Sequence, residues 1–396
     1  MTLFSLSLAY LRQRSLTTVL NLLLLALGVA TIVVLLLVNR QMEGRLARDA
    51  AGIDLVVGAK GSPLQLILSA VYHVDIPTGN IPLAEAEALS ADPLVKQTIP
   101  VALGDNFMGY RIVGTTPAYP AHYGAALADG RLFELSMEAT VGATVARAAK
   151  LRVGDLIVGS HGVGGEGHAH ADHPFEVVGI LEPTGTVLDR LVLTPVESVW
   201  DVHAAHGHDA AASGRGREVT AVLVTYASPL AAARLPRRIN QDTGMQAASP
   251  ASELVRLLSL VGVGLDAMRA FGFVLIVSAA LGTFVALYNS LQQRRYDLAV
   301  MRSLGGTRRT LVLQLVTEAM TVSLAGTLLG LGLGHGAAVA AGHLFPQAQD
   351  LGVTGFVFLA EELWLFALAA VIALLAAALP AVQVYRADVS AVLARG

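Results

Sequence analysis

Four apolar runs decide what this chain can fold into. They cover residues 17–38, 270–291, 311–344 and 363–384. Each is long enough to cross a bilayer as a helix, which takes about 20 mostly apolar residues. Between the first two runs, charges, prolines and glycines return over roughly 220 residues, and no run there is long enough to span. The sequence therefore predicts a membrane protein with one large domain outside the bilayer.

The composition agrees with this prediction. Of the 396 residues, 54% are hydrophobic and only 14% are charged, whereas a soluble globular protein is typically about a quarter charged. The net charge of -3 gives no indication of a nucleic-acid partner. The absence of cysteine excludes disulfides, thiolate metal sites and cysteine nucleophiles. The first run has the basic flank of a signal peptide, but it is longer than the usual core of about 7–15 residues, so we expect a retained helix.

Basic residues indicate which side of the membrane each segment faces. Segment 292–310 holds five arginines against one acid, and segment 1–16 holds two arginines and no acid. The loop at 345–362 holds three acids and no Lys or Arg. Because cytoplasmic loops carry the excess of Lys and Arg, both termini and segment 292–310 are predicted to be cytoplasmic. The large domain and the acidic loop are predicted to lie on the other side.

The predicted fold class is membrane α-helical, with four transmembrane helices in a 1 + 3 arrangement and a large α+β extracytoplasmic domain between helices 1 and 2. Short runs rich in Val, Ile and Leu predict strands near 54–57, 175–181, 190–193 and 219–225. The predicted organisation, in chain order, is a cytoplasmic segment 1–16, helix 1 at 17–39, the extracytoplasmic domain at 40–263, helix 2 with its stalk at 264–291, a cytoplasmic coupling loop at 292–310, helix 3 at 311–343, an extracytoplasmic loop at 344–362, helix 4 at 363–384 and a cytoplasmic tail at 385–396.

Three local motifs resemble a known family. They are SLAYLRQR at 7–14, RRYDLAVMRSLGGT at 294–307, and LPA at 379–381 with RADV at 386–389 and AVL at 391–393. Together they resemble the permeases that include MacB, FtsX and the lipoprotein-releasing LolC and LolE. Two positions depart from the family's pattern, since Asp297 stands where Glu is usual and Val389 where Pro is usual. The motifs match the membrane parts, whereas the outside domain matches mainly in position and size.

The resemblance implies the permease subunit of an ABC transporter in the bacterial inner membrane. Such subunits are not enzymes themselves, and they work as dimers beside two cytoplasmic ATPase subunits. ATP-driven closure of the dimer is passed through the helices to the outside domain. No Gly-x-x-x-x-Gly-Lys-Ser/Thr phosphate loop occurs in this sequence, so ATP and Mg²⁺ are expected on a separate partner chain. No catalytic motif is present, and no catalytic residue is assigned.

The resemblance also limits substrate and partners. The expected activity is export or extraction of a lipoprotein, a peptide or a hydrophobic compound, with a second copy of the permease, a periplasmic partner or lipoprotein, and membrane lipid as further contacts. The alternative is an FtsX-like regulator that activates an extracytoplasmic partner. An ion-coupled carrier would carry several charged residues at mid-membrane, and the runs contain essentially one.

Segment 292–310 is the predicted ATPase contact. On a helix, Tyr296, Val300 and Leu304 lie one turn apart on one face, and an amphipathic helix of this kind fits a groove on a partner protein. With the resemblance, the coupling residues are Arg294, Arg295, Tyr296, Asp297, Val300, Arg302, Leu304 and Gly305. The alternative is a basic loop that only sets topology and meets anionic lipid.

Glu318 lies about two turns inside the third run, where a carboxylate is costly and is a functional hypothesis by default. A role in helix packing, through hydrogen bonds from polar side chains such as Asn289, is the main prediction. Snorkelling to the cytoplasmic face and proton or ion handling are alternatives. The same run contains glycines at spacings that let helices approach closely, within the chain or between two copies: Gly326, Gly330, Gly332 and Gly336.

Histidines are concentrated in two Gly/Ala-rich segments of the outside domain. Neutral imidazole is a common ligand for zinc, copper and nickel, so the segments predict a weak, exchangeable site for zinc or a similar ion. The alternative is a solvated insertion that binds nothing. The candidate ligands are His161, His168, His170, His173, His203, His206 and His208.

Overall fold

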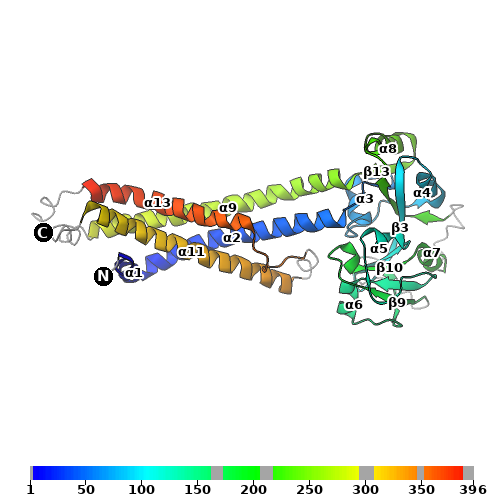
Figure 1. Cartoon of the computed structure of the whole chain (residues 1–396), viewed down its shortest axis with the longest axis horizontal. Coiled ribbons are helices and arrows are strands. Elements are labelled where there is room, and N and C mark those ends of the chain that lie inside the picture. Colours follow the sequence, from blue (N-terminus) through cyan, green and yellow to red (C-terminus); the bar gives the residue numbers. More distant parts are fainter. Residues whose placement is uncertain (1–2, 162–172, 206–216, 294–306, 346–351, 387–396) are drawn as a thin grey trace, which may run out of the picture. The chain divides into compact units, whose positions relative to one another are not determined.

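The structure is a computed structural model that describes residues 3–161, 173–205, 217–293, 307–345 and 352–386 (Figure 1). The chain divides into two compact units. The membrane unit comprises residues 1–43 and 261–396, and the large domain comprises residues 44–260. Two helices, α2 and α9, contribute residues to both units.

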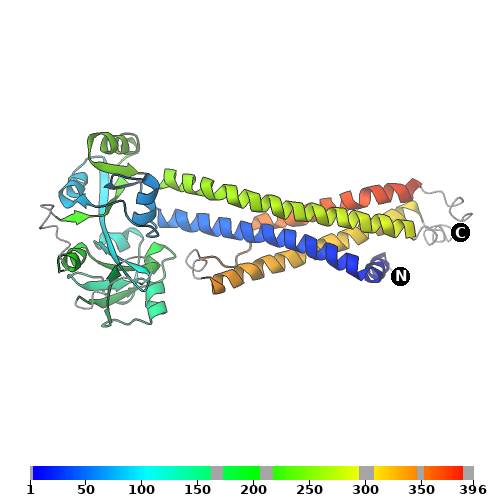
Figure 2. The same cartoon turned by 180° about the vertical axis from the view of Figure 1, so that it is seen from behind.

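The membrane unit is helical. Among the described residues, four helices are long and apolar enough to cross a membrane: α2 (Ser15–Asp49), α9 (Pro250–Gln293), α11 (Arg308–Leu344) and α13 (Leu363–Arg386). They run side by side within this unit in both views (Figures 1 and 2). A short helix, α1 (Leu3–Gln13), precedes α2, and the 3-10 helix η2 (Ala360–Glu362) precedes α13.

All four long helices supply side chains to one buried apolar cluster. Val33 comes from α2, Ile276 from α9, Ala338 from α11 and Leu365 from α13. A second cluster joins the other ends of α9, α11 and α13 through residues such as Leu287, Leu315 and Ala373. The apolar runs therefore form a packed bundle.

The large domain is built on an 11-stranded mixed sheet within the described residues. Its main path follows the order β13-β1-β12-β3-β4-β10-β6-β9-β5, with β7 on β9 and β8 on β3. A separate pair joins β2 and β11. The strands are β1 (Leu55–Ala59), β2 (Ile81–Pro82), β3 (Val95–Phe107), β4 (Tyr110–Thr115), β5 (Leu127–Gly130), β6 (Glu138–Val141), β7 (Leu156–Ile157), β8 (Ser160–His161), β9 (Phe175–Leu181), β10 (Leu191–Pro195), β11 (Glu218–Val219), β12 (Ala221–Tyr226) and β13 (Met245–Ala248).

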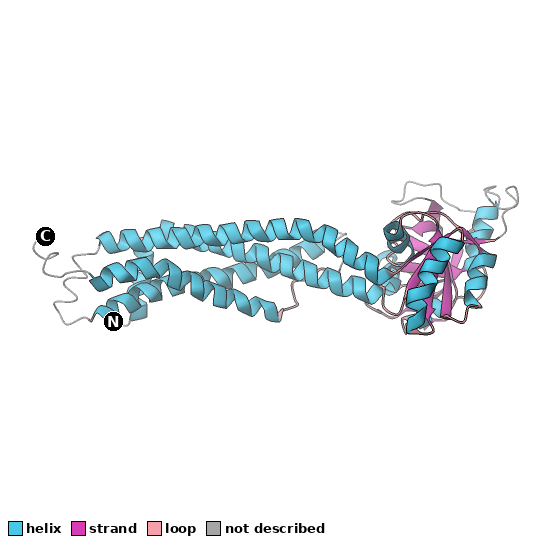
Figure 3. Cartoon of the chain, turned by 90° about the horizontal axis from the view of Figure 1, so that it is seen from above, coloured by secondary structure: helices cyan, strands magenta, loops and turns pink. Residues whose placement is uncertain are grey.

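The long strand β3 joins the two halves of this sheet. Its first half pairs with β12, from Val95 to Val101, and its second half pairs with β4, from Ala102 to Phe107. Helices pack around the strands (Figure 3). They are α3 (Pro63–Ala70), α4 (Leu83–Ser90), α5 (Ala118–His122), α6 (Ala143–Ala149), α7 (Val196–Ala205), α8 (Pro229–Asp242) and the 3-10 helix η1 (Val187–Arg190).

Both faces of the sheet are covered near β1. Val56 lies in one apolar cluster with Leu66 and Ile67 of α3, whereas Leu55 and Val57 lie in another with side chains of α8. Successive strand residues point to opposite faces, so a strand covered on both sides consists of a continuous apolar run. The predicted strands and the mixed α and β content of the domain are confirmed. Helix α2 continues about ten residues beyond the predicted end of helix 1.

Candidate functional site

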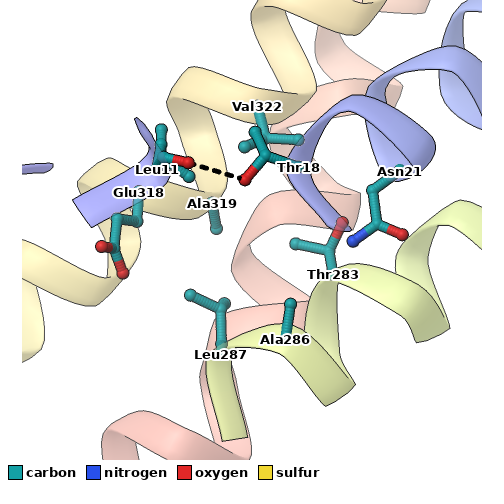
Figure 4. Close-up of a pocket in the computed structure, with 9 residues that line it drawn as sticks. All are labelled: Leu11, Thr18, Asn21, Thr283, Ala286, Leu287, Glu318, Ala319 and Val322. Carbon is teal, nitrogen blue, oxygen red and sulfur yellow. Dashed lines mark hydrogen bonds between the residues drawn. The ribbon is translucent and has the colours of Figure 1, made fainter. Parts of the chain in front are cut away.

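A small cavity, lined mainly by apolar surface together with a few polar side chains, lies in the membrane unit where α1, α2, α9 and α11 meet (Figure 4). Its volume is about 30 Å³, which is enough for a water molecule. Glu318 lines this cavity, and an ionisable residue inside an apolar transmembrane helix is a default candidate for function. The lining residues are Leu11, Thr18, Asn21, Thr283, Ala286, Leu287, Glu318, Ala319 and Val322.

Several hydrogen bonds tie the helices together around this cavity. The Thr18 hydroxyl donates to the Leu11 carbonyl at 3.2 Å, across the α1–α2 corner (Figure 4). Arg14, the residue between the two helices, donates from Nη1 to the Ala286 carbonyl of α9 at 2.9 Å. One turn before Glu318, Gln314 Nε2 donates to Ser7 Oγ of α1 at 2.9 Å. These hydrogen bonds involve α1, α2, α9 and α11, the four helices that line the cavity.

Glu318 is 4% exposed and lines the cavity together with Asn21, Thr18 and Thr283. Asn289, which the sequence suggested as a neighbour of Glu318, is exposed and does not line the cavity. Asn21 is held close to α9 because Gly282 faces it, and a Cβ atom there would lie 2.2 Å from Asn21 Oδ1. Sequence reasoning missed Asn21, although a polar residue inside the first apolar run was a visible signal.

A stripe of glycines on α11 faces α2. A Cβ atom on Gly326 would lie 2.8 Å from Leu25 Cδ2, and one on Gly334 would lie 2.7 Å from Val33 Cβ. Gly330, between them, approaches α2 in the same way. Gly332 and Gly336 have nothing within 4 Å of such an atom in the described part of the chain. The stripe has a period of four and includes Gly334, which the sequence analysis did not select.

All eight predicted coupling residues, from Arg294 to Gly305, lie outside the described residues. The structure describes only what flanks them. Helix α9 ends at Gln293, and α11 begins at Arg308 with Thr307 as its N-cap, whose side chain accepts a hydrogen bond from the Thr310 amide. ATPase contact through this segment stays a prediction.

Most of the predicted metal ligands also lie outside the described residues, namely His168, His170, His206 and His208. His161 ends β8, opposite Asp105 of β3, and His203 belongs to α7. His173 precedes β9. Among the described residues there is no group of three or more His, Cys, Asp or Glu side chains that could hold a metal ion. Metal binding by the histidine-rich segments stays a prediction.

The large domain contains a buried polar cluster that the sequence did not reveal. His73 Nε2 lies 3.0 Å from the Tyr119 hydroxyl, and His73 adopts a left-handed backbone conformation with φ of 55°. Tyr123 donates from its hydroxyl to the Asp49 carbonyl at 2.5 Å. Burial lowers the pKa of His73 to about 3, and the nearby charges of Arg111 and Arg190 act in the same direction. The imidazole is therefore neutral at physiological pH.

Two family models match successive parts of the chain. The MacB-like periplasmic core domain matches residues 18–242, and the FtsX-like permease C-terminal matches residues 269–389. Among curated relatives, the chain is 24% identical over 330 residues to the pyoverdine export ATP-binding/permease protein PvdT of Pseudomonas putida, which covers 80% of this chain and 49% of that protein.

The chain is also 24% identical over 345 residues to the macrolide export ATP-binding/permease protein MacB of Rhodospirillum rubrum. This match covers 83% of this chain and 51% of the relative. The chain thus spans about half the length of the curated relatives it matches.

Two solved structures are similar to the chain. The periplasmic region of MacB from Actinobacillus actinomycetemcomitans is 12% identical and covers 52% of this chain and 92% of that one, with a TM-score of 0.35. The extracellular domain of the noncanonic ABC-type transporter YknZ from Gram-positive bacteria is 16% identical, and the match covers 49% of this chain and 99% of that one, with a TM-score of 0.31.

Because the MacB-like model alone matches more than half of the residues and the FtsX-like model matches the C-terminal helices, the chain belongs to the MacB/FtsX-like family of ABC transporter permeases.

Proposed function

We propose that this chain is a permease subunit that couples ATP hydrolysis on a separate ATPase chain to movements of its large domain. The proposed activity is export of a lipoprotein, a peptide or another hydrophobic compound across the bacterial inner membrane, or its extraction from that membrane. Two copies of the permease act together with two ATPase subunits. The observation that carries the proposal is the succession of the MacB-like and FtsX-like matches along one chain with four candidate membrane helices.

Helix α9 supports the mechanical part of this proposal. It is a single helix of 44 residues, about 66 Å long at about 1.5 Å per residue, whereas the hydrocarbon core is about 30 Å thick. It starts at Pro250, two residues after β13, and ends at Gln293, directly before Arg294, the first of the predicted coupling residues. No proline follows Pro250 in this helix, so it lacks the commonest cause of a kink. A displacement at one end can therefore be passed along its length.

Copurification of the ATPase tests the proposal. The full chain is co-expressed with ABC ATPase subunits from the same source, either unaltered or as the double variant Arg295→Glu, Arg302→Glu. We expect this variant to insert normally and to lose most of the copurified ATPase, because its basic segment is the predicted contact. The matched control is Arg147→Glu, Arg152→Glu, which makes the same charge change at exposed residues of the large domain. Equal ATPase recovery in the two variants would favour the simpler role in topology and lipid contact.

A further inference from the structure

The connection between α11 and α13 is fastened to its neighbours. We call residues 352–362 the strap, which is the described part of that connection. Gln41 of α2 exchanges two hydrogen bonds with the Thr354 backbone, from Nε2 to the carbonyl at 2.8 Å and from the Thr354 amide to Oε1 at 2.9 Å. Gly355 lies so close to α11 that a Cβ atom there would be 2.1 Å from the His335 carbonyl. The strap is thus held by specific contacts on two helices.

His335 of α11 makes the most informative of these contacts. Its Nδ1 lies 2.7 Å from the Gly355 carbonyl, and its Nε2 lies 3.0 Å from Glu362 Oε2. The Phe358 ring packs on the imidazole with a centroid distance of 4.4 Å. His335 is 9% exposed and Glu362 is 5% exposed. The strap therefore buries a histidine between a carbonyl and a carboxyl group.

This geometry determines how many protons the pair holds. A carbonyl oxygen only accepts, so Nδ1 carries a proton. The Nε2–Oε2 contact then needs a second proton, either on the imidazole or on the carboxyl. In both cases the pair is neutral overall. Removing that proton leaves an imidazole lone pair facing a carboxylate, with a net negative charge in a buried place, and burial disfavours that state.

The charged side chains on the surrounding elements pair with one another or lie further along the chain, so they do not neutralise the His335–Glu362 pair after it loses its proton. Arg40 of α2 is paired with Glu361 of the strap, and both side chains are roughly half exposed. Glu43 lies near Arg40 and adds a further negative charge. On α9, Asp266 and Arg269 pair with each other at 2.7 Å. His343 lies two turns further along α11, and residues 363–385 of α13 contain no charged residue.

We propose that His335 and Glu362 form a proton-binding site that fastens the strap to α11, and that loss of the proton to solvent frees the strap. The released form contains a neutral imidazole and a carboxylate, so one proton leaves and no other group changes. Given the predicted topology, the site responds to protons on the extracytoplasmic side.

Cysteine labelling tests this proposal on the full chain, which has no cysteine of its own. Val353→Cys places a thiol at a position that is 7% exposed, next to α11, and Phe356→Cys places one at a position that is 79% exposed. The ratio of their maleimide labelling rates reports opening of the strap, because the exposed site corrects for the pH dependence of the reagent. The ratio should rise as the pH is raised, by up to about tenfold per pH unit, since one proton is released.

Two substitutions of Glu362 should have opposite effects on the labelling ratio. Glu362→Gln should keep the ratio low at every pH, because the amide donates a hydrogen bond to a neutral Nε2. Glu362→Ala should keep it high at every pH. The matched control Glu361→Gln should retain the pH dependence of the unaltered pair. The proposal is overturned if the labelling ratio does not change with pH when His335 and Glu362 are both present. It is also overturned if the ratio changes with pH to the same extent in Glu362→Gln. No ATPase is needed, so this proposal and the proposed function can fail separately.

Discussion

Gly330 of α11 lies so close to Val29 of α2 that a Cβ atom at residue 330 would be 2.6 Å from the Val29 Cβ. It would also be 2.7 Å from the Ala26 carbonyl oxygen. Carbon atoms do not approach to these distances, so no larger residue fits without moving one helix. The spacing of α2 and α11 therefore depends on a missing side chain at this position.

Replacing Gly330 with Ala should loosen this contact. We expect Gly330→Ala to destabilise the membrane unit by about 1–3 kcal/mol, the usual cost of overpacking. Gly332→Ala is the matched control, since nothing described lies within 4 Å of the added atom. Thermal unfolding of both variants in the same detergent measures the difference. Equal melting temperatures would show that the close approach of α2 and α11 does not limit stability.

Two substitutions of Glu318 separate packing from charge. Glu318→Leu removes a buried carboxyl group that lines the cavity and should destabilise the membrane unit by about 1–3 kcal/mol. Glu318→Gln keeps the shape and a polar end group, so we expect a smaller effect on both thermal stability and transport. If the Gln variant keeps its stability but loses transport as fully as the Leu variant, the charge itself is required and a role in proton or ion handling is favoured.

The ion pair between Arg131 and Glu138 should make the large domain resistant to acid. Arg131 hydrogen bonds, followed by the backbone amides of Glu134 and Leu135, lower the pKa of Glu138 to about 2. An unfolded Glu titrates near about 4.3, so the stabilisation is complete above that pH and is lost as the pH falls towards 2. Glu138→Gln should therefore lower the unfolding free energy at neutral pH and have little effect near pH 2.

Trp200 provides the measurement, because it lies in α7 of the large domain. In a Trp364→Phe background it is the only tryptophan, so denaturant titrations followed by its fluorescence report this domain. A Glu138→Gln effect of the same size at both pH values would contradict the assigned cause.

His73 should produce a separate acid limb in the same titrations. Its folded pKa of about 3 lies below the unfolded value of about 6.5. The unfolded state therefore binds the proton first, and stability is full above about pH 6.5 and falls as the pH drops from there to about 3, by up to about 1.4 kcal/mol per pH unit. His73→Gln should flatten this limb. An unchanged limb in His73→Gln would place the responsible group elsewhere.

The histidine-rich segments should bind zinc with roughly micromolar or weaker affinity, because their residues would lose conformational entropy on closing around an ion. Binding should weaken as the pH falls through about 6.5, since protonated imidazole cannot act as a ligand. The triple variant His168→Ala, His170→Ala, His173→Ala should lose most of it, and His343→Ala should not. Calorimetry decides, and equal zinc affinity in the two variants would exclude the predicted ligands.

Hydropathy alone predicted the four long helices, because spanning a bilayer demands a length that few other structures require. It did not predict that α2 continues to Asp49. The residues after Arg40 are mixed in character, and their helix is stabilised by packing of Leu46 and Ala50 against the core of the large domain. Such tertiary support leaves no periodic signal in a short polar stretch.

The polar sites were harder to predict for a related reason. Glu318 was visible as one carboxylate in an apolar run, but Asn21, which lines the same cavity, is distant in sequence and is placed by the close approach of α2 and α9 at Gly282. His335 and Glu362 are 27 residues apart, and only the return of the strap brings them together. Sequence shows which groups are costly to bury, and the packing of the helices decides which of them meet.

The first and last strands of the large domain, β1 and β13, are hydrogen-bonded neighbours, with Val56 opposite Ala248. A domain whose entry and exit lie side by side can be lengthened, shortened or exchanged internally without changing the distance between its two connections. The interior of this domain can therefore accept insertions or deletions while its first and last strands stay paired.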